Sequence, residues 1–457
     1  MISTRKTLLT HIKARADVFF HSTAYLVIVF AVAALGLTFN QEVVAIFVLL
    51  VLAVVSWLLV EDILPSFALV AVMGLIGLRI PREGLYHFVP LYYTPIFVVP
   101  AFIVKLFIQP FRFVKGRFFY PTLAVAIAVT LGGLFVISWD AYFAGATIFH
   151  TATLGVGMVI VYFIVERYLI TRPSMGDDFA RMMVAVGAVG AFMLAQSYVA
   201  RFDALDDFTV GAHFQWRNNL SNMLLMSMPF AFYLALKSKY PGTLMVIGTL
   251  QYVALVFSFS RGGIVFGTIM FPLVVGTTWW FGRHLRLHLM AVLSLFAGYF
   301  LYVMNVWLEP VHELVDRLEI RIRQATDDFD YSRWRLMRYA WENFMAHPIF
   351  GTGLGMSTAD HGYNPATMSM NWYHSTVAQV IGSTGIVGIL AYGYQEWVRI
   401  KTMVARFTPF NAFVGLSFLG FASYSLVNVG YHAPFFVALF LTMFVVLDRV
   451  NQQGDNL

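Results

Sequence analysis

Long apolar runs, separated by short polar stretches, recur along most of the chain. A run of roughly 18 or more residues can cross the hydrocarbon core of a bilayer as a helix. Backbone groups in lipid must be hydrogen-bonded within the chain, so these runs predict helices. We count about fourteen candidate spans, and twelve if two of them are re-entrant or interfacial; they are centred near residues 31, 52, 72, 100, 129, 154, 190, 228, 250, 271, 296, 384, 420 and 441. The pattern predicts an all-α polytopic membrane protein.

Composition excludes a soluble domain and several kinds of site. The chain has 457 residues, of which 59% are hydrophobic and 12% are charged, against about 25% charged in soluble domains. It has no cysteine, which excludes disulfides, thiolate metal sites and a cysteine nucleophile. Its net charge is +6, but no basic patch lies on a soluble domain, so we expect no nucleic-acid partner.

The distribution of Lys and Arg predicts the orientation. Basic residues gather in short cytoplasmic loops of membrane proteins. The tail up to Asp17 is basic and is followed by no signal-peptide cleavage site. Placing this tail inside puts most basic residues of the short loops inside too, including those near Arg112, Arg167, Lys237 and Arg399. We expect both termini to be cytoplasmic, because the number of spans is even.

One interval, residues 307–373, contains no full-length apolar span and is expected outside the membrane. Its middle, Tyr331 to His347, has the period of an amphipathic helix, with Trp334, Met337, Trp341 and Phe344 spaced by three or four residues. Pro348 and a run of glycines then end this helix.

Cations on the outer side are candidates for binding an anionic group. Arg261 lies between two candidate spans, where an interfacial arginine reaching the headgroups is the alternative. Arg333 opens the predicted helix, and its neighbours Arg335 and Arg338 can exchange roles with it. Guanidinium groups bind phosphate through two hydrogen bonds. The alternative for this group is a solvated face paired with nearby aspartates.

Glycines and a histidine complete the candidate residues. Gly351 and Gly353 allow backbone N–H groups to approach a ligand, although a simple turn would need them too. His374 precedes a span, and histidine is the usual general base near neutral pH; an interfacial polar residue is the alternative. Gly385 and Gly388 allow close helix packing.

Together these segments resemble the O-antigen ligase and polymerase superfamily of bacterial inner-membrane glycosyltransferases. Its Ser-Arg-Gly motif is similar to residues 260–262, and its arginine, helix and Pro-x-x-Gly-x-Gly pattern to Arg333 and residues 348–353. Its ligase signature is met by His374, Ser375, Gly385 and Gly388. The resemblance covers residues 245–395. It divides the chain into an N-terminal transmembrane region (1–244), a catalytic region (245–395) and C-terminal helices (396–457).

The resemblance implies a GT-C-like fold and a periplasmic active site. A glycan on undecaprenyl diphosphate would move to a lipid A–core sugar or a growing glycan, with no cofactor, nucleotide or metal. Arg261 and Arg333 would hold the diphosphate, and His374 would accept the proton of the attacking hydroxyl, with inversion at the anomeric carbon. Further candidates for substrate binding are Arg335, Arg338, Arg217, Arg201, Gly351, Gly353 and Tyr373.

Other functions stay open from the sequence. Ligases usually carry threonine- or valine-type residues after the last glycine, where this chain has Ile389 and Leu390. A polymerase that joins repeat units on undecaprenyl diphosphate, or a relative that glycosylates secreted proteins, uses the same donor. A polyprenyl-lipid transporter is the alternative from another class, but we find no inverted repeats or paired broken segments.

Overall fold

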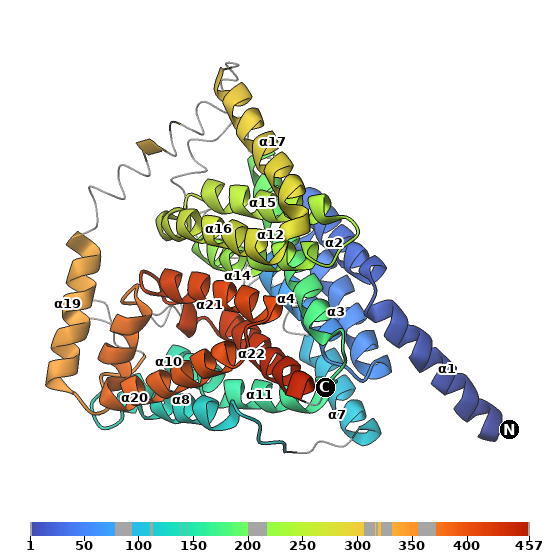
Figure 1. Ribbon diagram of the computed structural model, residues 1–457. Helices are drawn as coiled ribbons and strands as arrows, with labels where there is room; N and C mark the ends of the chain where they lie inside the picture. The colour runs from blue at the N-terminus through green and yellow to red at the C-terminus, as the bar shows by residue number, and fades with distance from the viewer. Residues whose placement is uncertain are drawn as a thin grey trace. The chain divides into compact units, whose positions relative to one another are not determined.

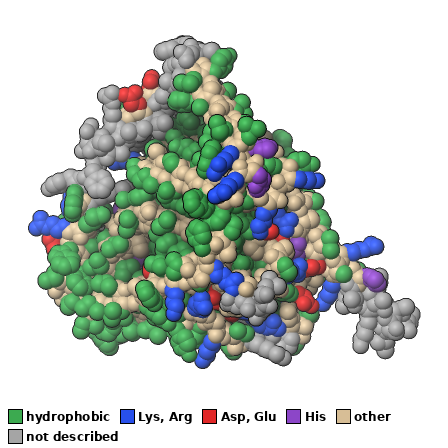
Figure 2. Space-filling view, in the orientation of Figure 1, with side chains coloured by type: hydrophobic (Ala, Val, Ile, Leu, Met, Phe, Trp, Pro, Cys, Tyr) green, Lys and Arg blue, Asp and Glu red, His purple; other side chains and the backbone are tan. Residues whose placement is uncertain are grey.

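The computed structural model describes residues 2–77, 94–109, 113–137, 139–143, 145–199, 217–305, 316, 319–320, 331–354 and 372–455. Within these ranges the regular elements are helices, and there is no strand. All of the predicted span centres fall inside helices. Hydrophobic side chains cover much of the visible surface in Figure 2, as expected of a protein surrounded by lipid. The chain is an all-α polytopic membrane protein.

Seven helical segments in the described ranges are long and apolar enough to cross a membrane: Glu42–Leu59, Thr147–Tyr168, Met175–Val199, Arg261–Phe281, Arg283–Tyr302, Thr376–Val404 and Pro434–Gly454. The pair His11–Phe20 and Thr23–Thr38, bent by 64°, adds an eighth if it forms one span. Shorter apolar helices occupy Leu64–Gly77, Val98–Ile108, Phe119–Leu131 and Pro241–Phe257. The total of twelve to fourteen spans stays a prediction.

The helices form two compact units, each made from two separate stretches of chain. Unit 1 comprises residues 1–112 and 167–313. Its helices are α1 (Ile2–Phe20), α2 (Thr23–Thr38), α3 (Glu42–Leu59), α4 (Leu64–Gly77), α7 (Thr94–Ile108), α12 (Met175–Val199), α14 (Arg217–Ala235), α15 (Pro241–Phe257), α16 (Arg261–Phe281), η3 (Arg283–Leu285) and α17 (Arg286–Asn305).

Helix α14 lies at the centre of unit 1. Every residue from Leu220 to Ala235 is buried, and α14 packs against α12, α15 and α16. A helix that is apolar on all sides is stable only when other helices surround it. The start of α14, which carries Arg217, is therefore fixed relative to the start of α16, which carries Arg261.

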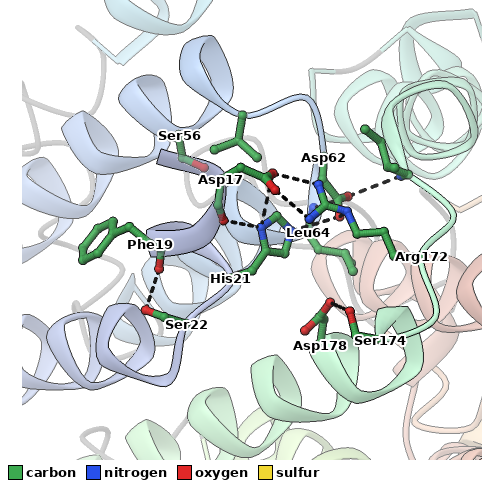
Figure 3. A network of polar contacts seen from close by, with 12 residues as sticks. Asp17, Phe19, His21, Ser22, Ser56, Asp62, Leu64, Arg172, Ser174 and Asp178 are labelled. Carbon is green, nitrogen blue, oxygen red and sulfur yellow. Dashed lines mark hydrogen bonds and ion pairs between the residues drawn. The ribbon is translucent and has the colours of Figure 1, made fainter. Parts of the chain in front are cut away.

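A polar network holds the bend between α1 and α2 in unit 1 (Figure 3). Arg172 donates to both carboxylate oxygens of Asp17, at 2.9 and 2.7 Å. The His21 ring contacts the Asp17 carbonyl at 2.8 Å and the buried Asp62 carboxylate at 3.0 Å. Buried charges need such partners. The polar tail recognised in the sequence is thus a helix, joined to the α3–α4 turn and to the segment before α12.

Unit 2 comprises residues 113–166 and 314–457. Its helices are α8 (Phe119–Leu131), α9 (Trp139–Tyr142), α10 (Gly145–Leu154), most of α11 (Val156–Tyr168), α19 (Tyr331–Ala346), α20 (Thr376–Val404), α21 (Pro409–Ser425), η4 (Gly430–His432) and α22 (Pro434–Asp455). The two units cut across the three consecutive regions expected from the resemblance, and that regional division stays a prediction.

Helix α20 consists of two halves joined at Gly385, whose φ is 59° and ψ −151°. The turn after α19 fills the break. Ile386 N–H donates to the Pro348 carbonyl at 2.8 Å, and Val387 N–H donates to the Ile349 carbonyl at 3.2 Å. In return, the carbonyls of residues 382 and 383 accept from the amides of residues 352 and 353, both at 2.9 Å. The broken helix therefore keeps its backbone hydrogen bonds by exchanging them with the turn.

Arg399 lies inside the second half of α20, whereas the charge pattern assigned it to an inner loop. It is 1% exposed, forms a 2.5 Å ion pair with Glu396 and places its guanidinium 4.6 Å from the Phe440 ring centre. Hydropathy alone does not distinguish a loop arginine from one that is buried with a partner.

Gly385→Ala is expected to destabilise the protein by at least about 2 kcal/mol. An L side chain rarely adopts this backbone conformation, and a Cβ would lie 2.5 Å from the Pro348 carbonyl oxygen. The matched control is Gly393→Ala in the same helix, where a Cβ meets nothing within 4 Å and alanine should stabilise by about 0.5–1 kcal/mol. Thermal unfolding of the purified proteins in detergent measures both; equal midpoints would contradict the role of Gly385.

Candidate active site

The start of α16 places Arg261 in unit 1. Ser260 caps this helix, and its hydroxyl accepts from the Gly263 N–H at 3.4 Å. Gly263 allows the close approach of α14, because a Cβ there would lie 2.7 Å from the Ser221 hydroxyl. The Ser-Arg-Gly segment is therefore a helix start fitted tightly against its neighbour, with Arg261 as the first helical residue.

Arg217 opens α14 at the same edge of unit 1. The Ser260 hydroxyl donates to Asn218 Oδ1 at 2.9 Å, which joins the first turns of α14 and α16. The hydroxyls of Ser221 and Ser258 form a second link of 2.7 Å. Arg261 thus begins α16, whose N-terminal N–H groups and dipole favour anions, and Arg217 is the first described residue of the adjacent α14. Arg201, another predicted cation, lies outside the described residues.

The sequence did not identify the residues that hold this edge. Asn218, next to the predicted Arg217, has its side chain linked to Ser260. The Tyr198 hydroxyl donates to the Phe257 carbonyl at 2.5 Å. One sequence signal could have indicated this contact. Asn218 is a polar residue directly after the predicted Arg217, and Ser260 is a serine that caps the helix of Arg261.

In unit 2, the predicted amphipathic helix is confirmed as α19. Helix α19 lies beside the first half of α20 (Figure 1), and Leu336, Met337, Tyr339 and Ala340 pack towards Tyr373 and Ala378. Trp334 and Trp341 are exposed, contrary to the apolar face expected from their spacing. The physical reason is that the small Ala340, 1% exposed, allows close approach to α20, and the two large rings lie on the other side.

The three arginines of α19 occupy different positions on the helix. Arg335 and Arg338 are exposed, and Arg338 pairs with Glu342 at 2.9 Å. Arg333 lies in the first turn. Helical periodicity puts position 333 one turn before Leu336 and Met337, which pack against the cluster around Tyr373. Of the three, Arg333 is the arginine whose helix position is nearest to the α20 side.

Gly351 and Gly353 serve the fold of unit 2. Their φ angles are 62° and 80°. The amides of residues 351, 352 and 353 already donate to the carbonyls of His347, Gly382 and Ser383. A Cβ at Gly351 would lie 2.5 Å from the Ser383 carbonyl carbon. These amides complete the broken helix, and a role of Gly351 and Gly353 in substrate binding stays a prediction.

His374 is exposed and lies directly before α20. Ser375 caps the helix by accepting from the Ala378 N–H at 3.4 Å, and the Thr376 N–H donates to the Asn428 carbonyl at 3.0 Å. The imidazole is thus on a fixed helix start and accessible from outside the protein, as a general base must be.

Tyr373, expected at the substrate, is fully buried between α19 and α20. Its hydroxyl accepts from Asn343 Nδ2 at 2.5 Å, and its N–H donates to Gln379 Oε1 at 3.1 Å. Burial raises the pKa of the Tyr373 phenol, and hydrogen bonds with Asn343 and Thr352 offset part of that increase. The phenol is neutral at physiological pH, and its ring has no exposed face for a sugar.

The predicted residues thus divide between the units: Arg261 and Arg217 belong to unit 1, and His374 and the three arginines of α19 belong to unit 2. The described residues contain no cluster of three or more His, Asp or Glu able to hold a metal. These predicted residues are arginines and one exposed histidine, His374. Such residues can bind a phosphate group and accept a proton.

Comparison with known families agrees with this chemistry. Residues 244–393 match the family described as O-antigen ligase. No curated protein matches the chain. The matched region includes Arg261, Arg333, the turn at residues 348–354 and His374, and so contains the main candidates of both units. Residues 244–393 of this chain are therefore similar to the O-antigen ligase family, and this similarity supports the resemblance found in the sequence.

Proposed function

We propose that this protein is an inverting glycosyltransferase of the bacterial inner membrane. It moves a glycan from undecaprenyl diphosphate to a sugar hydroxyl of lipid A–core on the periplasmic side. The observation that carries this proposal is the O-antigen ligase match over residues 244–393, which contains Arg261, Arg333 and His374.

The roles follow from charge. Arg261 begins a capped helix, so the positive end of that helix dipole adds to its guanidinium, and Arg333 belongs to α19, which packs against α20. Both side chains hold the diphosphate. They stabilise the negative charge that grows on the diphosphate oxygen as its bond to the anomeric carbon breaks.

His374 accepts the proton of the acceptor hydroxyl. The hydroxyl oxygen forms the new bond to the anomeric carbon from the face opposite the leaving diphosphate, so the configuration inverts. The electron pair of the broken bond leaves with undecaprenyl diphosphate. This transfer requires no metal, because the donor already carries a good leaving group.

A polymerase is the second candidate function. The observation that favours it is Ile389-Leu390 after Gly388, where ligases carry threonine- or valine-type residues. Both side chains are exposed, at 41% and 67%, so this departure changes the outer surface of α20. A polymerase would use the same donor with a growing glycan as acceptor.

Reconstituted protein is expected to convert undecaprenyl-diphosphate glycan only when lipid A–core is present. Gel and mass spectrometry should show the glycan attached to lipid A–core. His374→Ala should lower turnover by about 100-fold or more. Longer glycans still attached to undecaprenyl, independent of lipid A–core, would establish the polymerase instead. Turnover of His374→Ala within about threefold of wild type would remove the general-base role.

Arg261→Ala and Arg333→Ala should each lower kcat by about 100-fold, because each removes a preorganised charge from the leaving group. Lysine should restore only part of the rate, since it lacks the planar pair of donors. Steady-state kinetics with varied donor measures these effects, with Arg283→Ala at the other end of α16 as the control. A larger loss in Arg335→Ala or Arg338→Ala than in Arg333→Ala would reassign the α19 role.

A further inference from the structure

His374 has a left-handed backbone, with φ at 53°. This conformation is uncommon for a residue with a side chain, because the side chain crowds the following backbone. Such residues persist only where neighbouring contacts impose the conformation, and they are concentrated at functional sites. The residues on each side of His374 therefore have to be held firmly.

Tyr373 holds the segment on one side. Its side chain is 0% exposed and lies in a cluster with Ala340 of α19 and Ala378 of α20. Its hydroxyl is fixed by Asn343 at 2.5 Å, and its N–H by Gln379 at 3.1 Å. Gln379 in turn donates to the Ser383 hydroxyl at 2.8 Å, next to the break in α20.

Trp372 holds the same segment one residue earlier. Its ring centre is 5.2 Å from that of His150 in α10, with the planes nearly perpendicular, and 5.9 Å from that of His432. Tyr392 of α20 stacks on His432 at 5.8 Å. His432 is 1% exposed, so these contacts lie inside the helix core. Side chains at 372 and 373 thus fix the backbone immediately before His374.

The Asn343 contact also connects the two reactive groups of unit 2. Asn343 is part of α19, the helix that begins next to Arg333, and Tyr373 is bonded to His374. One hydrogen bond therefore links the helix that carries the proposed diphosphate-binding arginine to the backbone of the proposed base.

We infer that Tyr373 and Asn343 are positioning residues, which hold His374 in its left-handed conformation and at a set distance from the helix of Arg333. This inference rests on the proposed function. Neither side chain touches substrate. Both act through the backbone of His374, so their loss should displace the imidazole while leaving the diphosphate-binding arginines in place.

The test uses Tyr373→Phe, Asn343→Ala and the double variant in the full-length protein. Tyr373→Phe keeps the ring and deletes only the hydroxyl, so packing is preserved. Each single variant should lower kcat roughly 10- to 100-fold, the size expected for a misplaced catalytic group, while donor KM changes by less than about twofold. The double variant should lose no more than Tyr373→Phe, since both remove the hydrogen bonds of the Tyr373 hydroxyl with Asn343 and Thr352.

Two reference variants separate the possible failures. Met345→Ala, at a 62% exposed position on α19, should keep wild-type kcat. His374→Ala reports on the proposed function itself. If His374→Ala is inactive while Tyr373→Phe and Asn343→Ala keep wild-type kcat, the positioning role is wrong and the proposed function stands. Additive losses, or losses that follow a lowered unfolding temperature, would also overturn the positioning role.

Discussion

The hydrogen bonds across the break in α20 are the constraint on which unit 2 depends. A break leaves N–H and C=O groups without helical partners, and each unsatisfied group costs several kcal/mol in a membrane. The turn at residues 348–353 supplies partners for two amides and two carbonyls of α20. Three positive-φ glycines, Gly351, Gly353 and Gly385, make this fit possible. Gly133 of the first stretch of unit 2 also donates to the Phe350 carbonyl at 3.1 Å.

These hydrogen bonds explain how α19, which belongs to the long polar interval of the sequence, takes a fixed position. The turn is continuous with α19, so its attachment to α20 sets where α19 lies. Helix α19 then packs along the first half of α20 through Ala340 and Ala378. The result places the arginine-bearing helix beside the segment that carries His374, with backbone hydrogen bonds rather than loop packing as the support. In unit 1, the links between Asn218 and Ser260 and between Ser221 and Ser258 do the same for Arg217 and Arg261.

The sequence predicted the helices, but it did not predict the contacts that support the candidate residues. Apolar run length is a direct consequence of bilayer thickness, and the predicted centres fall in helices for that reason. The period of residues 331–347 located α19, but period alone does not say which face another helix covers, and the two tryptophans proved exposed. Glycine motifs were read as ligand contacts or packing positions. Their positive φ angles depend on the tertiary exchange between the turn and α20, which no local pattern shows. The inward direction of Tyr373 likewise depends on Asn343, thirty positions away.

Hydrogen–deuterium exchange of the wild-type protein tests the central claim most directly. Peptides that cover residues 348–354 and 382–388 report the amides of Thr352, Gly353, Ile386 and Val387. If the turn and the broken helix form one hydrogen-bonded frame, these amides should be protected together, and all four should lose protection together in Gly385→Ala but not in Gly393→Ala. Rapid exchange of these amides in active wild-type protein, or loss of protection at only one side of the break, would contradict the account.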